Sequence, residues 1–185
     1  MPSSPSRLSL VTSSGFGDYA LVDSGTGRKL ERFGGVLVDR PEAQALWRPA
    51  LPSADWSKAH AVFSASGEDD EKGKWRVDRP VAESWPVRIG VRAEGATSDS
   101  PPAAVTVTMQ CRLQGLWHLG LFPEQLPHWA WMLARIAAVA GERPRVLNLF
   151  AYTGAATLIA AAAGAEVTHV DASKKAIAWA KDNQV

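Results

Sequence analysis

The chain has 185 residues, a hydrophobic content of 46% and a charged content of 21%, which exclude a disordered polypeptide. This length suffices for one ordinary domain, or for one small domain and part of another. The net charge of +1 gives no support for a strong nonspecific phosphate-binding surface, although it leaves room for a local basic patch. The single cysteine, Cys111, excludes an internal disulfide and suits a reducing compartment.

The N-terminal segment carries no targeting signal that we can identify. Residues 1–11 contain one arginine and only a short apolar run, which is too weak for a signal peptide. No segment approaches the roughly 18 apolar residues of a membrane span. Residues 1–18 are rich in Ser, Pro and Gly and predict a loose tail. We therefore expect a cytoplasmic protein.

Residues 19–113 are predicted to form a β-rich accessory domain. Short segments of strand-forming residues lie at 19–22, 30–33, 36–38, 61–63, 74–77, 87–92 and 105–113. The turn cluster at 23–27 predicts a hairpin between the first two of them. Residues 41–47 begin with a proline and predict one or two helical turns.

The hydrophobic period changes after a connecting segment at residues 114–126. Apolar residues at helical spacing predict a helix over 127–140, with Gly141 as its C-cap. We then expect a strand at 145–149, a helix at 155–163, a strand at 166–170 and a helix at 174–183. This alternation predicts a parallel sheet, so residues 127–185 read as the start of a Rossmann-like α/β domain. The whole chain is predicted to be α+β.

The strand at 146–149 and the turn that follows it carry the main functional signal. An apolar strand, a Thr153-Gly154 turn, a helix and a second strand ending at Asp171 are how an α/β sheet builds a nucleoside pocket. Gly154 lets backbone approach a ligand, and Asp171 can accept hydrogen bonds from both hydroxyls of a ribose. Asn148 is the polar exception in its strand, and we expect its side chain to hold the following turn. The apolar remainder predicts a central strand covered on both faces.

The type of ligand follows from what the turn lacks. Phe150 and Tyr152 stand where a dinucleotide fingerprint would place glycines, so no cradle for a pyrophosphate is evident. A ligand with a ribose but no pyrophosphate fits better, and S-adenosyl-L-methionine (SAM) is the common one. The alternative is an α/β domain in which the Thr-Gly turn and Asp171 only cap helices.

These residues resemble the class I SAM-dependent methyltransferases. Residues 146–154, 164–167 and 170–173 carry the resemblance to the class. Residues 118–125 and 23–31 make the chain similar, more narrowly, to the group containing the bacterial ribosomal-RNA cytosine-C5 methyltransferases. The resemblance implies a methyltransferase (a transferase) acting on RNA, with SAM as cofactor and a role in rRNA processing.

The resemblance also implies a set of cofactor-binding positions. Asp171 would bind the ribose hydroxyls, the loop at 150–154 would lie against the methionine part, and residues 122–125 would close one side. The full set is Phe122, Pro123, Glu124, Gln125, Asn148, Phe150, Ala151, Tyr152, Thr153, Gly154, Asp171, Ala172 and Ser173. No catalytic residue and no metal ligand is assigned.

In that family the adenine-binding acidic residue, the Asp-Pro-Pro-type motif and the nucleophilic cysteine come later in the chain, and none of them is present in these 185 residues. Cys111 lies in an alternating strand, where we expect a small buried residue and not a nucleophile. We therefore expect a C-terminally truncated, inactive chain with exposed strand edges, which favour pairing into a homodimer.

Several side chains have a structural and a functional interpretation. His118 is expected to be structural more than catalytic, and Glu124 either contacts the methionine amino group or precedes a helix start. Most of the tryptophans are expected to lie in the core, and Arg28, Lys29 and Arg32 on a solvated edge.

Two other functions stay open. The chain could be a non-catalytic RNA- or protein-binding module with a remnant methyltransferase segment, or another class I relative such as an aminopropyl transferase.

Overall fold

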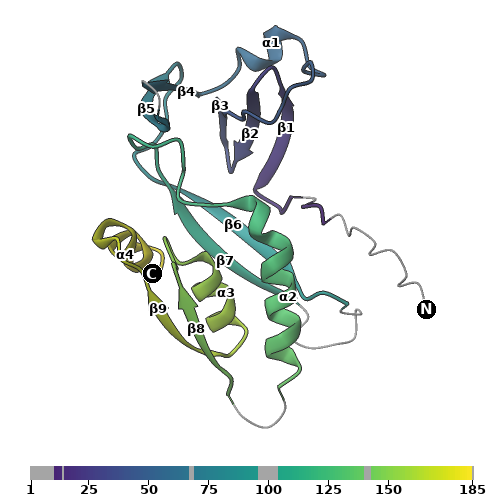
Figure 1. Cartoon of the computed structure of the whole chain (residues 1–185), viewed down its shortest axis with the longest axis vertical. Coiled ribbons are helices and arrows are strands. Elements are labelled where there is room, and N and C mark those ends of the chain that lie inside the picture. The colour runs from purple at the N-terminus through teal and green to yellow at the C-terminus, as the bar shows by residue number, and fades with distance from the viewer. Residues whose placement is uncertain (1–10, 14, 67–68, 96–103, 140–142, 185) are drawn as a thin grey trace, which may run out of the picture.

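The N-terminal half forms a five-stranded sheet in the computed structural model, which describes residues 11–13, 15–66, 69–95, 104–139 and 143–184 (Figure 1). The strands run in the order β1 (Tyr19–Gly25), β2 (Arg28–Phe33), β3 (Val36–Pro41), β4 (Ala61–Ser66) and β5 (Asp69–Val77). Neighbours are antiparallel except β3 and β4, which are parallel and joined through helix α1 (Ser53–Trp56). The predicted strands of this region are confirmed.

The β1–β2 hairpin explains why the helical turns predicted at 41–47 are wrong. Thr26 and Gly27 form its two-residue turn with positive φ values of 53° and 73°, as a primed hairpin turn requires. Their N–H groups donate to the carbonyls of Trp47 and Ala45 at 2.8 Å. Backbone that would bond within a helix therefore bonds to the hairpin turn, and Pro41 ends β3 instead of starting a helix.

Helix α1, which the sequence pattern did not predict, follows a segment held by a buried carboxylate. Asp23 accepts hydrogen bonds from the N–H groups of Ala50 and Leu51 and from the indole N–H of Trp56. Although burial opposes ionisation, these bonds hold the pKa of Asp23 below its ordinary value. A long-range anchor of this kind has no local sequence signal.

A second, two-stranded sheet forms the middle of the molecule. Strands β6 (Trp85–Arg92) and β7 (Ala104–Cys111) are antiparallel, with Trp85 opposite Cys111. Buried and exposed residues alternate along β6, which is the pattern of a strand covered on one face. Helix α2 (Leu126–Ala137) packs on β6, and helix α3 (Ala155–Ala162) packs on β7 (Figure 1).

The C-terminal part follows the predicted strand–helix alternation. Parallel strands β8 (Arg145–Leu149) and β9 (Glu166–Val170) flank α3, and α4 (Lys174–Asp182) follows. A 3-10 turn, η1 (Pro123–Gln125), leads into α2. Helix α2 ends at Ala137, earlier than expected, and the predicted Gly141 cap lies outside the described residues.

One apolar core runs through both halves of the chain. Phe33 and Val38 of the five-stranded sheet, Ile89 of β6, Leu121 before η1 and Ile159 of α3 belong to the same buried cluster. The hairpin β6–β7 therefore contributes to the packing of α2 and α3. The domain boundary at residues 114–126 stays a prediction.

The expectation that strand 146–149 is covered on both faces is wrong for the described chain. Leu147 is 62% exposed, Leu149 54% and Val170 43%, whereas alternate residues of the same strands face α3. Among the described elements, helices lie against one face of the β8–β9 sheet only (Figure 1). The outward side chains are apolar but have no layer above them.

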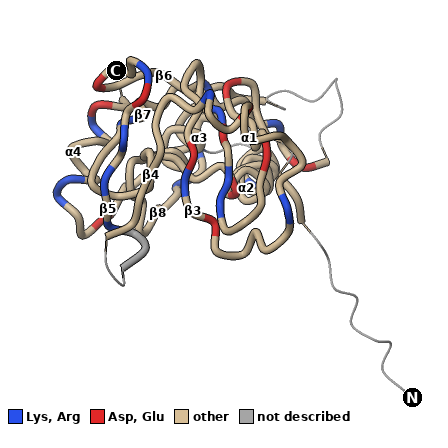
Figure 2. Tube along the Cα trace, turned by 90° about the horizontal axis from the view of Figure 1, so that it is seen from above, with Lys and Arg blue, Asp and Glu red and all other residues tan. Residues whose placement is uncertain are grey.

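Charge is dispersed over the molecule. Lys and Arg are interspersed with Asp and Glu along the trace in Figure 2. None of the helices in the described ranges has the length and apolar content needed to cross a membrane.

We predict that truncating the outward side chains costs little stability. Leu149→Ala should lower the free energy of unfolding by less than about 1 kcal/mol, because the side chain is already half in water. Leu133→Ala in α2, where the side chain is 1% exposed, should cost about 2–5 kcal/mol. Urea unfolding of both variants checks this, and equal costs would mean that Leu149 is covered in solution.

Candidate functional site

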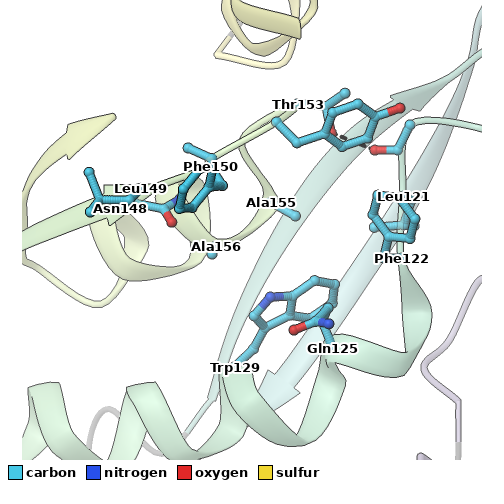
Figure 3. A pocket seen from close by; sticks show the side chains of 13 residues that line it. Leu121, Phe122, Gln125, Trp129, Asn148, Leu149, Phe150, Thr153, Ala155 and Ala156 are labelled. Carbon is cyan, nitrogen blue, oxygen red and sulfur yellow. Dashed lines mark hydrogen bonds between the residues drawn. The ribbon is translucent and has the colours of Figure 1, made fainter. Parts of the chain in front are cut away.

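A cavity of about 330 Å³ lies where β8 ends and the segment before η1 passes close to it. Figure 3 shows Trp129 and Gln125 on one side and Asn148, Leu149 and Phe150 on another. Its lining consists of Gly120, Leu121, Phe122, Gln125, Trp129, Asn148, Leu149, Phe150, Ala151, Tyr152, Thr153, Ala155 and Ala156. The size falls in the range of small-molecule sites, and mostly apolar walls with few polar groups are typical of them.

The loop after β8 has an unusual backbone. Phe150 and Tyr152 have φ values of 54° and 50°, and Gly154 has 95°. Left-handed conformations at bulky residues cost free energy and persist where the surroundings hold them. Ala151 N–H donates to Val170 O at 3.1 Å, which ties the loop to the end of β9. The Phe150 ring is left 92% exposed at the cavity.

The Asp171 carboxylate binds the backbone of this loop. Its Oδ1 accepts from Ser173 N–H at 2.7 Å and its Oδ2 from Tyr152 N–H at 2.8 Å. These two backbone hydrogen bonds, with that from Ser173 the stronger influence, hold the pKa of Asp171 below its ordinary value. The lowered pKa keeps Asp171 charged at neutral pH. Because a carboxylate offers about four acceptor positions, Asp171 can still accept hydrogen bonds from a ligand.

A buried set of hydrogen bonds fixes the loop against the rest of the chain. The Thr153 hydroxyl donates to Gly120 O, and Asn183 Nδ2 donates to Thr153 O at 2.8 Å. Asn183 Oδ1 in turn accepts from Gln110 N–H at 2.8 Å. Thr153 is 1% exposed and Asn183 5%. The loop, the segment before η1, the end of α4 and strand β7 are thus bound together.

Aromatic side chains line the same junction. The ring centroids of Phe122 and Tyr152 lie 5.3 Å apart, and those of Tyr152 and Trp179 lie 6.3 Å apart. Trp179 also donates its indole N–H to Gln110 O at 2.8 Å. Burial raises the pKa of Tyr152 to about 12, so its hydroxyl is neutral. This wall is apolar and uncharged at neutral pH.

The structure brings part of the predicted site together. Seven predicted residues line the cavity: Phe122, Gln125, Asn148, Phe150, Ala151, Tyr152 and Thr153. Six do not: Pro123, Glu124, Gly154, Asp171, Ala172 and Ser173. Of these, Ser173 caps α4 by accepting from Ala176 N–H. The cofactor-binding role of both groups stays a prediction.

One predicted local role differs in the structure. Asn148 does not hold the turn, because its amide donates to the Thr157 hydroxyl of α3 at 2.9 Å. Gly154 does not line the cavity. A Cβ there would make ordinary contact with Ala180 Cβ at 3.4 Å, so it is the positive φ of 95°, and not the approach of α4, that favours glycine.

Some lining residues were not predicted. Gly120, Leu121, Trp129, Leu149, Ala155 and Ala156 complete the cavity. Trp129 sits on the apolar stripe of α2 and is 5% exposed, so its pattern is that of a core residue. No sequence signal separates a core residue from a cavity wall when one side chain serves as both.

Several residues weighed for function have structural environments. Cys111 is 0% exposed, and burial raises the pKa of its thiol to about 12, as expected for a buried structural residue. Arg28 and Lys29 pair with Asp39 and Glu42. The described residues contain no group of three or more potential metal ligands of the His, Cys, Asp and Glu types.

The fold is similar to that of a solved SAM-dependent methyltransferase. The crystal structure of the enzyme from Agrobacterium tumefaciens matches with a TM-score of 0.78 and 48% sequence identity, over 93% of this chain and 49% of that one. A "putative SAM-dependent methyltransferase" from Streptococcus mutans matches at a TM-score of 0.55 with 14% identity, over 93% of this chain and 43% of its own, which supports the fold alone. The chain thus spans about half of the solved structures.

More particularly, part of the chain is similar to ribosomal RNA large subunit methyltransferase K/L. The protein of Shewanella sp. (strain W3-18-1) is 47% identical over 72 residues, which are 38% of this chain and 9% of the relative. That of Magnetococcus marinus is 49% identical over 65 residues, or 35% and 8% of the two chains. No family model matches. The α+β fold class is confirmed, with SAM-dependent methyltransferases as structural neighbours.

We predict that Gly120→Ala disrupts the junction. Gly120 has φ 92°, and a Cβ would lie 2.3 Å from a ring carbon of Trp179. Strain and overpacking should lower the free energy of unfolding by about 2–4 kcal/mol. Gly90→Ala, at a position with nothing within 4 Å of the added carbon, is the control and should change it by less than about 0.5 kcal/mol. Thermal or urea unfolding measures both, and equal small effects would contradict the packing described.

We predict a pH signature for Asp171. Because its folded pKa is lowered, its contribution to stability is complete above the unfolded value of about 3.9 and is lost as pH falls through the folded value. The difference in unfolding free energy between wild type and Asp171→Asn should be about 1–2 kcal/mol, constant from pH 8 to about 5, and should shrink below about pH 4. A difference that grows at low pH would contradict this assignment.

Proposed function

We propose that this chain carries part of the cofactor site of a SAM-dependent methyltransferase. The carrying observation is the cavity beside the strained 150–154 loop, at the carboxyl end of β8, in a chain 48% identical to a solved SAM-dependent methyltransferase. In open α/β sheets, ligands bind at the carboxyl ends of the strands. The proposal extends to the methyltransferase activity of a whole protein that contains this chain.

The residues present fit the cofactor in chemistry. Asp171 is an anion at neutral pH with acceptor positions left for a ribose diol. The 150–154 loop and residues 120–122 supply apolar and backbone contacts for the remainder of the molecule. The Gln125 side chain at the cavity adds a neutral polar group that can donate to or accept from the methionine part.

SAM would supply an activated methyl group on a sulfonium. The described residues would bind and orient it and would exclude water through Trp129, Leu121 and Phe122. Positioning is the main source of rate in such a transfer. Cys111, buried at 0% exposure, is unsuited to act as a nucleophile toward a base. This chain therefore contributes binding, and the group that activates the acceptor is not assigned to it.

The substrate class in this proposal is RNA, most specifically ribosomal RNA. It is supported by the 47% identity to ribosomal RNA large subunit methyltransferase K/L over 72 residues. Cytosine C5 as the methylated atom rests on the sequence resemblance alone. A homodimer through the uncovered face of β8–β9 is a further part of the proposal, supported by the exposure of Leu147 and Leu149.

Calorimetric titration of SAM into the 185-residue chain tests the cofactor site. We expect micromolar binding that Asp171→Ala weakens at least tenfold, because a charge-assisted hydrogen bond is worth about 1.5–3 kcal/mol. Asp78→Ala, which loses only an exposed pair with Arg76, is the control and should bind as wild type. Absence of binding to a folded sample, or equal loss in both variants, would contradict the site.

A further inference from the structure

A second cavity, of about 690 Å³, is also bordered by η1. Phe122 and Gln125 line the first cavity, whereas Glu124 lines the second. Its lining comprises Ser13, Gly15, Tyr19, Ala20, Leu21, Ser24, Lys29, Glu31, Glu42, Gln44, Trp47, Trp117 and Glu124. Nothing in the comparisons assigns a role to it.

The floor of this cavity is a buried charged network. Glu31 is 1% exposed and Arg40 3%, and Arg40 donates to Glu31 through Nε and, at 3.0 Å, through Nη2. The Tyr19 hydroxyl donates to Glu31 Oε1 at 3.0 Å. A buried ion pair is weak as a source of stability, because desolvation offsets the attraction. A rigid, charged floor under an open cavity instead suits recognition of a polar ligand.

The charges at the rim favour a ligand with N–H donors. Lys29 pairs with Glu42 at 3.1 Å, so these two charges compensate. Glu124 is exposed and makes no hydrogen bond or ion pair with another described residue. Carboxylates therefore exceed cations, which disfavours a phosphate and favours an amino group.

An exposed indole that offers a flat surface lines the same cavity as these carboxylates. Trp47 is 58% exposed, and its Nε1 donates to Ser24 O at 2.9 Å, which restrains the ring. Trp117 is a poorer platform, because Lys29 and Arg40 already lie 5.3 and 5.1 Å from its ring centroid. Single-stranded RNA bases bind proteins by stacking on aromatic rings and by hydrogen bonds to their Watson–Crick edges.

We propose that this second cavity binds an unpaired nucleobase that bears an amino group, with the base stacked on Trp47 and its amino group donating to Glu124. The inference rests on the proposed RNA methyltransferase function and names a contact of its substrate. The phosphates would remain outside, away from the carboxylates. The base held here can be a neighbour of the methylated nucleotide.

Two pentanucleotides of equal charge test this proposal on the full chain. Oligocytidylate carries an amino group where oligouridylate carries a carbonyl, so phosphate contacts cancel in the comparison. We expect oligocytidylate to bind roughly tenfold more tightly, and Glu124→Ala to remove that preference. Trp47→Ala should weaken both ligands, because stacking tolerates any base.

The controls are Glu83→Ala and Trp131→Ala, which change exposed residues outside the cavity. Both should bind as wild type, and circular dichroism checks that every variant is folded. Equal affinity for the two oligonucleotides, or a preference that survives Glu124→Ala, would overturn the proposal. A penta-arginine peptide that binds more tightly than oligocytidylate and depends on Glu124 would overturn it in favour of a basic protein partner. If the chain binds SAM but shows no preference between the two oligonucleotides, only the role proposed for the second cavity is refuted. If it neither binds SAM nor shows a preference, the proposed methyltransferase function is refuted as well.

Discussion

The structure depends most on the buried hydrogen bonds that centre on Thr153. Through its hydroxyl and its carbonyl, this residue joins Gly120 before η1 to Asn183 after α4. Asn183 extends the connection to Gln110 in β7. The loop with left-handed residues cannot relax while these bonds persist, because buried polar groups lose partners if it moves. The walls of the first cavity are therefore set by contacts between segments far apart in the chain.

The β8–β9 sheet is covered on one face only in the described chain. Helices α2 and α3 pack on the hairpin β6–β7, and α4 bonds to it through Trp179. Leu147 and Val170 face outward, and Leu149, which is also exposed, borders the cavity. Apolar residues at such exposure mark a surface that is stabilised when another layer covers it. The chain spans 49% of the Agrobacterium tumefaciens structure, so the comparison leaves the other half of that fold without a counterpart here.

The sequence pattern correctly predicted the features that depend only on residues close together in the chain. Strands β8 and β9 have the predicted bounds, and the positive φ of Gly154 agrees with a glycine at the turn. The pattern did not predict the features that are determined by contacts between distant segments. Trp47 and Ala45 bond to a hairpin turn, so no helix forms there, and Asn148 bonds to α3 instead of its own turn. Cavity walls such as Trp129 have the spacing of core residues, because they serve as both.

A crystal structure of the chain grown with S-adenosylhomocysteine would show whether the cofactor site is preformed, because it locates the ligand without requiring turnover. We expect ligand density between residues 120–122 and 148–153, with the ribose hydroxyls within hydrogen-bonding distance of Asp171 and the Thr153 bonds unchanged. Density elsewhere on the molecule, or a loop at 150–154 that rearranges and loses the Thr153 contacts on binding, would contradict a preformed cofactor site.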